Sequence, residues 1–428
     1  MEIRLRVLDG LRRTALRTSR ASALLAVFAI AGGCACYRPA PIDTLALAAG
    51  AVTQDRAGLR VSVAIPSDDE VERLFGVSLA KQNIQPVGLV IANHTEDAYW
   101  FLPLALDPDY FTPIEAANRA RYRFSGSANE RMRAQFLASA IGSYVGPGQS
   151  ISGFVFTNLS RGVKAVNVDL FRADRLVQFF FMIKIANVKA DYQEVDLEKL
   201  DAEPIRDVSE AELRAALEAM PCCAATEDGR GMDDPLNFVL IGQADEVFPN
   251  FVRSGWQVTE VLRASSALQT FWSYFFSSQY QHAPISPIYL FGRRQDGALQ
   301  KSRETARERN HLRIWRTQLR LAGKPVWIGQ ISRDVGLTFS WKSFIGHEVD
   351  PDVDEARNYL AQDMLRSQGV ARFGWVKGVG AAPSSQPHHM ADGSPFFTDG
   401  LRLVLLLDRD PVPLDEINLL GWEKPPPR

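Results

Sequence analysis

The sequence predicts an α+β protein with two parts: an N-terminal β-sandwich-like domain with helical inserts, then a mixed α+β C-terminal domain. Short runs of β-branched and aromatic residues, bounded by Gly, Pro, Asn or Asp, recur along the chain and are typical of strands. Later strand patterns are mixed with helical ones, which suggests helices attached to an antiparallel sheet. A chain of 428 residues, 46% of them hydrophobic, is long enough for two or three domains.

Residues 1–33 have the pattern of a lipoprotein signal peptide. A segment with six arginines and two acidic residues precedes the apolar run ASALLAVFAIAGG. That run is shorter than the roughly 20 residues of a membrane-spanning helix, and small residues end it, as in a secretory signal. AGGC, residues 31–34, resembles a bacterial lipobox, in which Cys34 is diacylated and becomes the mature N-terminus. An ordinary signal peptide or an uncleaved anchor are the alternatives.

The lipobox predicts a membrane-anchored protein that faces the periplasm. Ala35, not Asp, follows Cys34, which favours the outer membrane. Removal of residues 1–33 takes away a net charge of +4 and changes the formal charge from −2 to −6. A mildly acidic chain without a basic tract is a poor nucleic-acid binder. The predicted partners are therefore the membrane, through the lipid, and a protein or envelope component of unknown identity.

A tether over residues 34–56 leads to a β-rich domain over residues 57–190. Two helices are expected within this domain. SDDEVERLFG has Ser67 as its N-cap and ends at Gly76, and ANERMRAQFLASAIGSYVGPG stops at its Gly-Pro-Gly. The expected strands are LRVSVAI, VGLVIAN, SISGFVFTN, KAVNVDLF and LVQFFFMIKI.

Residues 191–219 are charged and read as a linker plus an opening helix that starts at a capping box, Ser209 to Glu212. The second domain is predicted over residues 220–410, with a tail over 411–428 whose last residues are disordered. Its expected helices are a short one through Val247 to Val252, SSALQTFWSYFFSSQY and DVDEARNYLAQDMLRSQ. Its expected strands are DDPLNFVLIG, NHLRIWRTQL, KPVWIGQISRDVGLTFS, ARFGWVKGV and LRLVLLLD.

The second domain resembles one family, the LssY C-terminal domain. The resemblance rests on PCCAATEDGRGMDDPLNFVLIG, PISPIYLFGRRQDGALQK, RNHLRIW, GKPVWIGQISRD and GHEVDPDVDEARNYL, which follow one another in the family's order. The family often has paired histidines where this chain has Asn310 and His311. The resemblance implies a bacterial envelope protein, and it implies no established reaction or cofactor.

The chain has four cysteines, at positions 34, 36, 222 and 223, too few for a disulfide framework. Cys222 and Cys223 could form a vicinal disulfide in an oxidising compartment, stay as two buried thiols, or pair with Cys36. P-loop, G-x-S-x-G, H-E-x-x-H and CxxC motifs are absent from the sequence. The aromatic run at residues 271–280 fits a core helix better than a membrane-facing patch.

Polar residues of the second domain supply the candidate site. The catalytic candidates are His311, His347, Asp334 and Asp350. Two imidazoles and a carboxylate suit a zinc or iron site, or a histidine–carboxylate acid/base pair. The same residues also suit a helix cap and two separately hydrogen-bonded histidines. If they act together, the two histidines should lie within about 8 Å of each other, which leaves room for a water or a metal.

Arg293 and Arg294 are the candidate binding residues, because paired arginines bind phosphate or carboxylate. Their structural alternative is to cap the acidic helix at residues 352–363. The metal and any cofactor are unknown from the sequence. The favoured function is a lipid-anchored envelope protein that serves as a binding or structural module. The alternative is a hydrolase, metal-dependent or not, that uses the His/Asp cluster.

Overall fold

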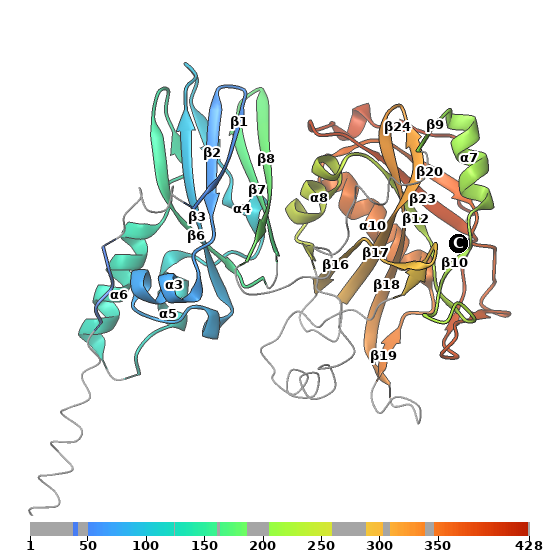
Figure 1. The fold of residues 1–428 in the computed structure, drawn as a ribbon, viewed down its shortest axis with the longest axis horizontal. Coiled ribbons are helices and arrows are strands. Elements are labelled where there is room, and N and C mark those ends of the chain that lie inside the picture. The colour runs from blue at the N-terminus through green and yellow to red at the C-terminus, as the bar shows by residue number, and fades with distance from the viewer. Residues whose placement is uncertain are drawn as a thin grey trace, which may run out of the picture.

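A computed structural model describes residues 37–41, 50–123, 125–160, 163–185, 205–258, 288–302, 309–338 and 346–426. The first domain is built from two four-stranded sheets whose inner faces pack against each other (Figure 1). One sheet has the order β1(Val52–Arg56), β2(Leu59–Ala64), β3(Ile84–Asn93), β6(Ser150–Asn158). The other has the order β5(Tyr144–Val145), β4(Tyr99–Phe101), β7(Val163–Arg172), β8(Arg175–Lys184).

The alternation of buried and exposed side chains along the strands produces this core. In β2, Leu59, Val61 and Val63 are buried, while Arg60 between them is exposed, because successive side chains point to opposite faces of a sheet. The paired inner faces confirm the predicted sandwich-like domain. The sandwich starts earlier than predicted, however, since β1 lies inside the stretch read as a tether, and Tyr37 is also buried.

Helices cover the outer face of the β3–β6 sheet. Phe154 and Phe156 of β6 point away from the sandwich core and pack against Phe75 and Phe136, which come from two helices. The elements of this region are α3(Asp68–Phe75), η1(Ala80–Gln82), α5(Pro113–Arg119) and α6(Gly126–Ser139), whereas α4(Pro103–Leu106) packs on β7.

The ends of α3 follow the sequence signals, and the end of α6 does not. Ser67 and Glu70 form a capping box, and Gly76 ends α3 with a φ of 67°. α6 ends at Ser139, well before the Gly-Pro-Gly predicted to stop it, because Tyr144–Val145 pairs with β4 as β5.

A ten-stranded mixed sheet forms the second domain. The main path is β13(Gln257–Val258), β16(Gly297–Ser302), β17(Arg309–Leu321), β18(Lys324–Thr338), β12(Phe238–Ile241), β23(Leu401–Leu407), β20(Val370–Lys377), β24(Asn418–Leu419). β19(Gly346–Val349) also pairs with β18, and β9(Arg206–Val208) with β17. β12 and β23 are parallel at the centre, and the short pairs β20–β24 and β17–β9 are parallel as well, so the sheet is mixed where an antiparallel one was expected.

Each face of this sheet is covered. Leu312 and Ile314 of β17 pack with α8(Ala244–Arg253) and α10(Val353–Arg366). Trp315 lies on the other face, under α7(Glu210–Ala219) and a small sheet. That small sheet has the order β11(Met232–Pro235), β10(Cys223–Ala225), β14(Tyr289–Leu290), β15(Arg293–Arg294).

Both predicted boundaries of the second domain need correction. At its start, β9 pairs with β17 and α7 packs into the core, so residues 206–219 belong to the domain and not to a linker. At its end, β24 lies in the stretch predicted as a tail and joins the sheet. η4(Leu414–Glu416) precedes β24, and a hairpin of β21(His388–His389) and β22(Pro395–Phe396) projects before β23.

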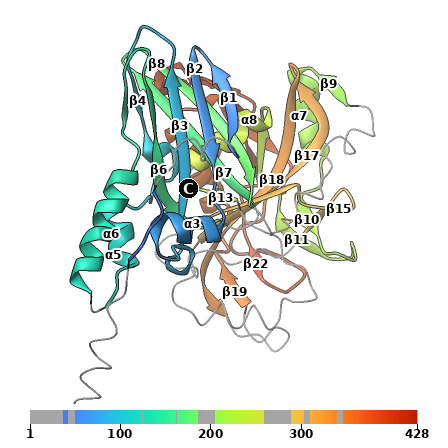
Figure 2. The ribbon, with the colours of Figure 1, turned by 60° about the vertical axis from the view of Figure 1, so that its left-hand side comes forward.

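The two domains contact each other through α8, which packs on β7 and α4 (Figures 1 and 2). Arg253 of α8 pairs with the buried Asp169 of β7 at 3.0 Å, and Phe180 stacks on Phe248. None of the helices in the described ranges has both the length and the apolar character of a transmembrane span. The predicted signal peptide, the linker segment before residue 205 and the aromatic helix at 265–280 lie outside the described residues.

Candidate functional site

A row of buried polar side chains follows β17 and β18. The antiparallel register sets Arg309 opposite Asp334, His311 opposite Ser332 and Arg313 opposite Gln330. Alternate residues of a strand share a face, so the row lies on the same side of the sheet as Trp315. All six side chains of the row are nearly or fully buried.

Asp334 is shared between two partners at one end of the row. Arg309 donates from Nε to Asp334 Oδ2 at 3.0 Å and from Nη1 to Gln300 Oε1 at 2.7 Å. His311 Nδ1 lies 3.4 Å from the other carboxylate oxygen, Asp334 Oδ1. The predicted His311–Asp334 pair therefore lies within ion-pair distance but is not hydrogen-bonded through these two atoms, and Arg309 binds the other carboxylate oxygen.

The other end of the row is held by Asp234, which comes from β11. Arg313 donates to Asp234 Oδ2 at 3.2 Å and to Gln330 Oε1 at 3.1 Å, while Ser332 donates from its hydroxyl to Asp234 Oδ1 at 3.0 Å. Burial lowers the pKa of Arg313, although the neighbouring carboxylates oppose this. Burial raises the pKa of Asp233 to about 6, and the adjacent charge of Asp234 adds to the effect.

His347 lies in β19, the strand that follows β18, and Asp350 comes directly after that strand. The backbone of His347 is opposite Leu337, five residues beyond Ser332. Its side chain is outside the described part of the chain, so the convergence of the two histidines stays a prediction. Asp350 accepts the backbone N–H of Asp352 at 3.0 Å, which places it in the turn before α10.

The residues predicted to start the acidic helix do so. Asp352 is the N-cap of α10 and accepts the N–H of Glu355 at 3.3 Å. Asp354 is buried, pairs with Arg357 at 3.0 Å and accepts the Thr398 hydroxyl at 2.7 Å. Arg357 also binds Asp399 at 2.7 Å, so this cluster fixes the helix to the start of β23.

Arg293 and Arg294 form β15, directly after the tight turn at Phe291 and Gly292 that joins it to β14. Arg293 pairs with Asp296 at 2.8 Å and donates to the carbonyl of Arg316 at 2.6 Å. Burial raises the pKa of Asp296 to about 6, partly offset by Arg293. Arg294 donates to the hydroxyl of Tyr289 at 3.1 Å. The contacts of Arg293 hold its own turn to β17, which is a structural role.

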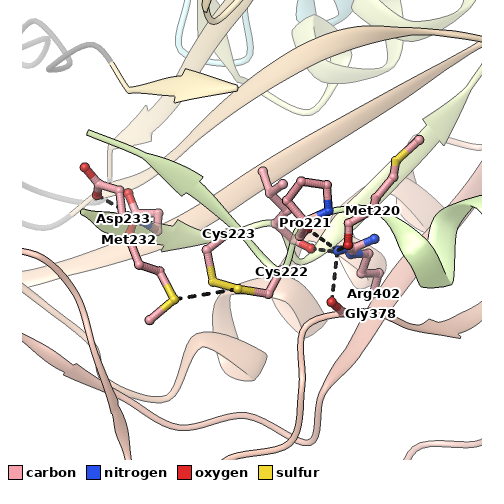
Figure 3. The surroundings of a disulfide bond; sticks show 10 residues. Met220, Pro221, Cys222, Cys223, Met232, Asp233, Gly378 and Arg402 are labelled. Atoms are coloured by element: carbon pink, nitrogen blue, oxygen red, sulfur yellow. Dashed lines mark hydrogen bonds between the residues drawn. A yellow bond between two sulfur atoms is a disulfide. The ribbon is translucent and has the colours of Figure 1, made fainter. Parts of the chain in front are cut away.

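A disulfide joins Cys222 to Cys223, which decides among the three alternatives for these cysteines (Figure 3). It lies where α7 leads into β10, with Met232 Sδ 3.6 Å from Cys222 Sγ. Beside it the fully buried Arg402 donates to the carbonyls of Leu217, Leu236, Met220, Pro221 and Gly378.

Chemically, the row combines a histidine–carboxylate contact with a serine directly opposite the histidine. The sequence interpretation included His311 and Asp334 but not Ser332, Arg309, Arg313 or Asp234. In the sequence, polar residues alternate with others in RNHLR and in ISRD. This pattern identifies the row only when the register between the two strands is known. Within the described ranges, no group of three or more His, Cys, Asp or Glu side chains is arranged to hold a metal ion.

Fold and site together define an α+β domain whose mixed sheet carries an internal row of ion pairs and which contains a vicinal disulfide. Residues 216–401 match the family model described as LssY C-terminus, which confirms the predicted resemblance for the second domain. The search of curated proteins found no match to the chain.

Proposed function

We propose that this protein is a lipid-anchored bacterial envelope protein whose LssY-type domain is a binding or structural module. The observation that carries the proposal is the mutual pairing of the charged groups in the candidate site. Arg309 is committed to Asp334 and Arg313 to Asp234, at 3.0 and 3.2 Å, and all four side chains are buried. Removing one partner from such a pair leaves an uncompensated buried charge, so the pairs are suited to holding one arrangement of the strands.

The lipid anchor is supported by where the folded body begins. Tyr37 is the third residue after Cys34 and is 4% exposed, packed in the aromatic core under α3 and α6. A lipid on Cys34 would hold the first domain close to the membrane surface, because an extended chain covers only about 3.5 Å per residue. The contact between α8 and β7 would then hold the second domain to the anchored first domain.

Replacement of the acylated cysteine tests the anchor. The wild-type protein is expected in the membrane fraction, and Cys34→Ala in the soluble periplasmic fraction after a high-salt wash. Cys36→Ala is the matched control and should stay with the membrane. Mass spectrometry of the mature N-terminal peptide should show a diacylglyceryl adduct in the wild type. Membrane retention of Cys34→Ala after the wash would contradict the lipobox assignment.

A hydrolase is the second candidate, and the contact between His311 and Asp334 favours it. A base oriented by a carboxylate needs a nucleophile within reach. Ser332 is directly opposite His311, and directly opposed residues have Cβ atoms about 5 Å apart. In this structure the Ser332 hydroxyl donates to Asp234 instead, so catalysis would require it to turn towards the imidazole.

Screening separates the two candidates. The mature chain should be assayed against ester, phosphoester and glycoside substrates, with and without a chelator. The binding-module proposal expects no turnover above that of a His311→Ala, Ser332→Ala double variant. A hydrolase would lose turnover on Ser332→Ala and on His311→Ala, while Ser139→Ala, a buried serine of the first domain, would retain it. Circular dichroism must show that each variant is folded.

A further inference from the structure

We propose that the helical end of the first domain is a membrane-docking surface that binds anionic phospholipid headgroups through the arginines of α5 and the turn after it. The inference rests on the proposed lipid anchor and adds a second, electrostatic contact to it. Three observations support it: where the N-terminal segment docks, which side chains surround that point, and how charge is distributed over the chain.

The N-terminal segment is fixed to the helical end. Ala40 N–H donates to the carbonyl of Arg73 at 2.7 Å, and Gln135 donates from Nε2 to the carbonyl of Ala40 at 3.3 Å. The ring of Tyr37 lies against Gly76, where an added Cβ would come within 2.8 Å of it. The path from the membrane to the fold therefore ends on α3 and α6, at the end of the first domain away from α8 (Figure 1).

Arginines surround this docking point. Tyr122, the next residue to both Arg121 and Arg123, donates from its hydroxyl to the carbonyl of Gly76 at 3.2 Å. Both arginines are exposed. They line an open groove together with Arg119 and residues of α5. The remaining lining residues are Thr112, Ile114, Glu115 and Asn118.

The groove keeps a net positive charge, because it is lined by three arginines and one glutamate. Arg119 pairs with Glu115 at 3.2 Å and lies over the ring of Phe111 at 4.5 Å. Arg133 reaches the rim from α6 and donates to Asn118 Oδ1 at 2.9 Å. The groove thus presents guanidinium groups on two helices and a turn, beside uncharged hydroxyl and amide groups.

The charge of this region is opposite to that of the chain as a whole. Residues 111–140 contain five arginines and two glutamates, a net charge of +3, whereas the chain without residues 1–33 has a formal charge of −6. α3, at the same end, carries four acidic residues and one arginine, so the excess of cations is confined to the side formed by α5, α6 and the turn between them. Anionic lipid surfaces attract such basic clusters, which a neutral or cationic partner would not.

The short separation between Cys34 and Tyr37 favours the membrane as the partner of this surface. Cys34 and Tyr37 are three residues apart, so a lipid on Cys34 keeps Tyr37 within about 10 Å of the headgroups. That span is close to the Debye length of about 8 to 10 Å at physiological salt, within which the arginines and headgroup phosphates still attract each other. Guanidinium groups also bind phosphate oxygens in bidentate fashion.

Vesicle sedimentation tests the surface without the lipid. The chain from residue 34 with Cys34→Ala keeps every described residue and is mixed with vesicles of phosphatidylcholine alone or of equal parts phosphatidylglycerol and phosphatidylcholine. We expect binding to the anionic vesicles only, weakened by added salt. The triple variant Arg119→Ala, Arg121→Ala, Arg123→Ala should bind about tenfold more weakly. Arg175→Ala, Arg206→Ala, Arg366→Ala removes three exposed arginines elsewhere and should bind like the parent.

Two outcomes would overturn the inference: equal binding to neutral and anionic vesicles, or no difference between the triple variant and the parent when both show the same thermal midpoint. The result is separable from the lipid anchor. If Cys34→Ala is released from membranes in cells and the soluble chain ignores anionic vesicles, the anchor stands and the docking surface is wrong. If the vesicle result holds but no diacylglyceryl adduct is found, the surface stands without the lipid.

Discussion

At the scale of single residues, Arg402 of the second domain donates hydrogen bonds to five backbone carbonyls. It is fully buried in β23 and donates to carbonyls from α7, from the segment before the disulfide and from the chain after β20. Burial lowers its pKa to about 10, so it remains charged at neutral pH. Its five acceptors are backbone oxygens from separate segments, so the guanidinium ties these segments together.

We predict that Arg402→Met strongly destabilises the protein. Buried carbonyls that lose a charged donor each cost about 1 to 3 kcal/mol, so the total loss should exceed about 3 kcal/mol. Arg402→Lys should recover only part of it, since an ammonium has three donors and no planar fork. Denaturant titration measures the loss, with exposed Arg366→Met as the control. A midpoint within experimental error of wild type would contradict the role.

Asp233 gives a pH-dependent prediction. Burial and the neighbouring Asp234 raise its pKa to about 6. A carboxyl with a raised pKa in the folded state binds its proton more tightly there, so wild-type stability falls as the pH rises from about 4 to about 6. Asp233→Asn should therefore match wild type near pH 4 and be more stable by about 1 to 2 kcal/mol at pH 7, after allowance for its partial exposure.

Thermal or denaturant unfolding at several pH values measures this difference. Asp415→Asn, an exposed carboxyl, is the control and should give a pH-independent offset near zero. An Asp233→Asn variant whose advantage is largest at pH 4 would reverse the assigned sign.

The sequence allowed part of the polar row to be predicted. His311 and Asp334 are of the residue types that exchange protons or bind metal ions, so each is recognisable alone. Arg309, Arg313 and Ser332 belong to the site only because the register sets them opposite particular partners. Asp234 reaches the row from β11, about 80 residues earlier in the chain. Such a contact depends on tertiary packing, which periodicity does not encode.

At the scale of elements, local signals worked where the chemistry is local. The Ser67 N-cap of α3 and the capping box of α7 form as predicted, and Ser67 also forms a capping box with Glu70. Short elements were missed. β5, β9 and β24 have two or three residues each, so their strand character comes from a neighbouring strand and not from their own pattern.

Loss of either N-cap should have a measurable effect. Ser67→Ala and Ser209→Ala remove the acceptor for the N–H of Glu70 and Glu212, and each should lower the free energy of unfolding by about 1 kcal/mol. Ser127→Ala, at an exposed position inside α6, is the matched control and should be neutral or slightly stabilising. Equal effects at all three positions would mean that capping is not responsible.

At the scale of the whole molecule, one buried ion pair crosses between the domains. The Asp169 side chain is 1% exposed and pairs with Arg253 at 3.0 Å. Burial raises the pKa of Asp169, while Arg253 acts in the opposite direction. Arg253 also donates to the carbonyl of Ser367, which holds it within the second domain.

We predict that Arg253→Met costs about 3 kcal/mol or more, because it leaves the Asp169 carboxylate buried without its cation. Asp169→Asn should be milder, and Asp169→Asn with Arg253→Met should recover much of the loss. The double-mutant cycle, measured by denaturant unfolding, isolates the coupling from the Ser367 contact. Strictly additive effects would show that the pair does not couple the domains.

Limited proteolysis should cut first between residues 190 and 205. The sequence there is charged and lacks apolar periodicity, and β9 begins the second domain at Arg206. Gel electrophoresis and mass spectrometry should find two resistant fragments that separate fully only at high denaturant or after Arg253→Met. A first cut inside β2 to β6 would contradict the two-domain division.

The parallel pairing of β12 with β23 has a consequence for how the protein is made. Phe238 pairs with Leu403, so the centre of the sheet joins segments more than 160 residues apart, and β23 also supplies the partner of β20. Until the ribosome has completed residue 407, β12 can pair with β18 but not with β23. The carbonyl groups that Arg402 binds also lack their donor until then. The second domain must therefore stay unfinished for almost the entire synthesis of the chain, a state compatible with passage through a translocation channel as an unfolded thread. It can close only when nearly all of the polypeptide has been synthesised.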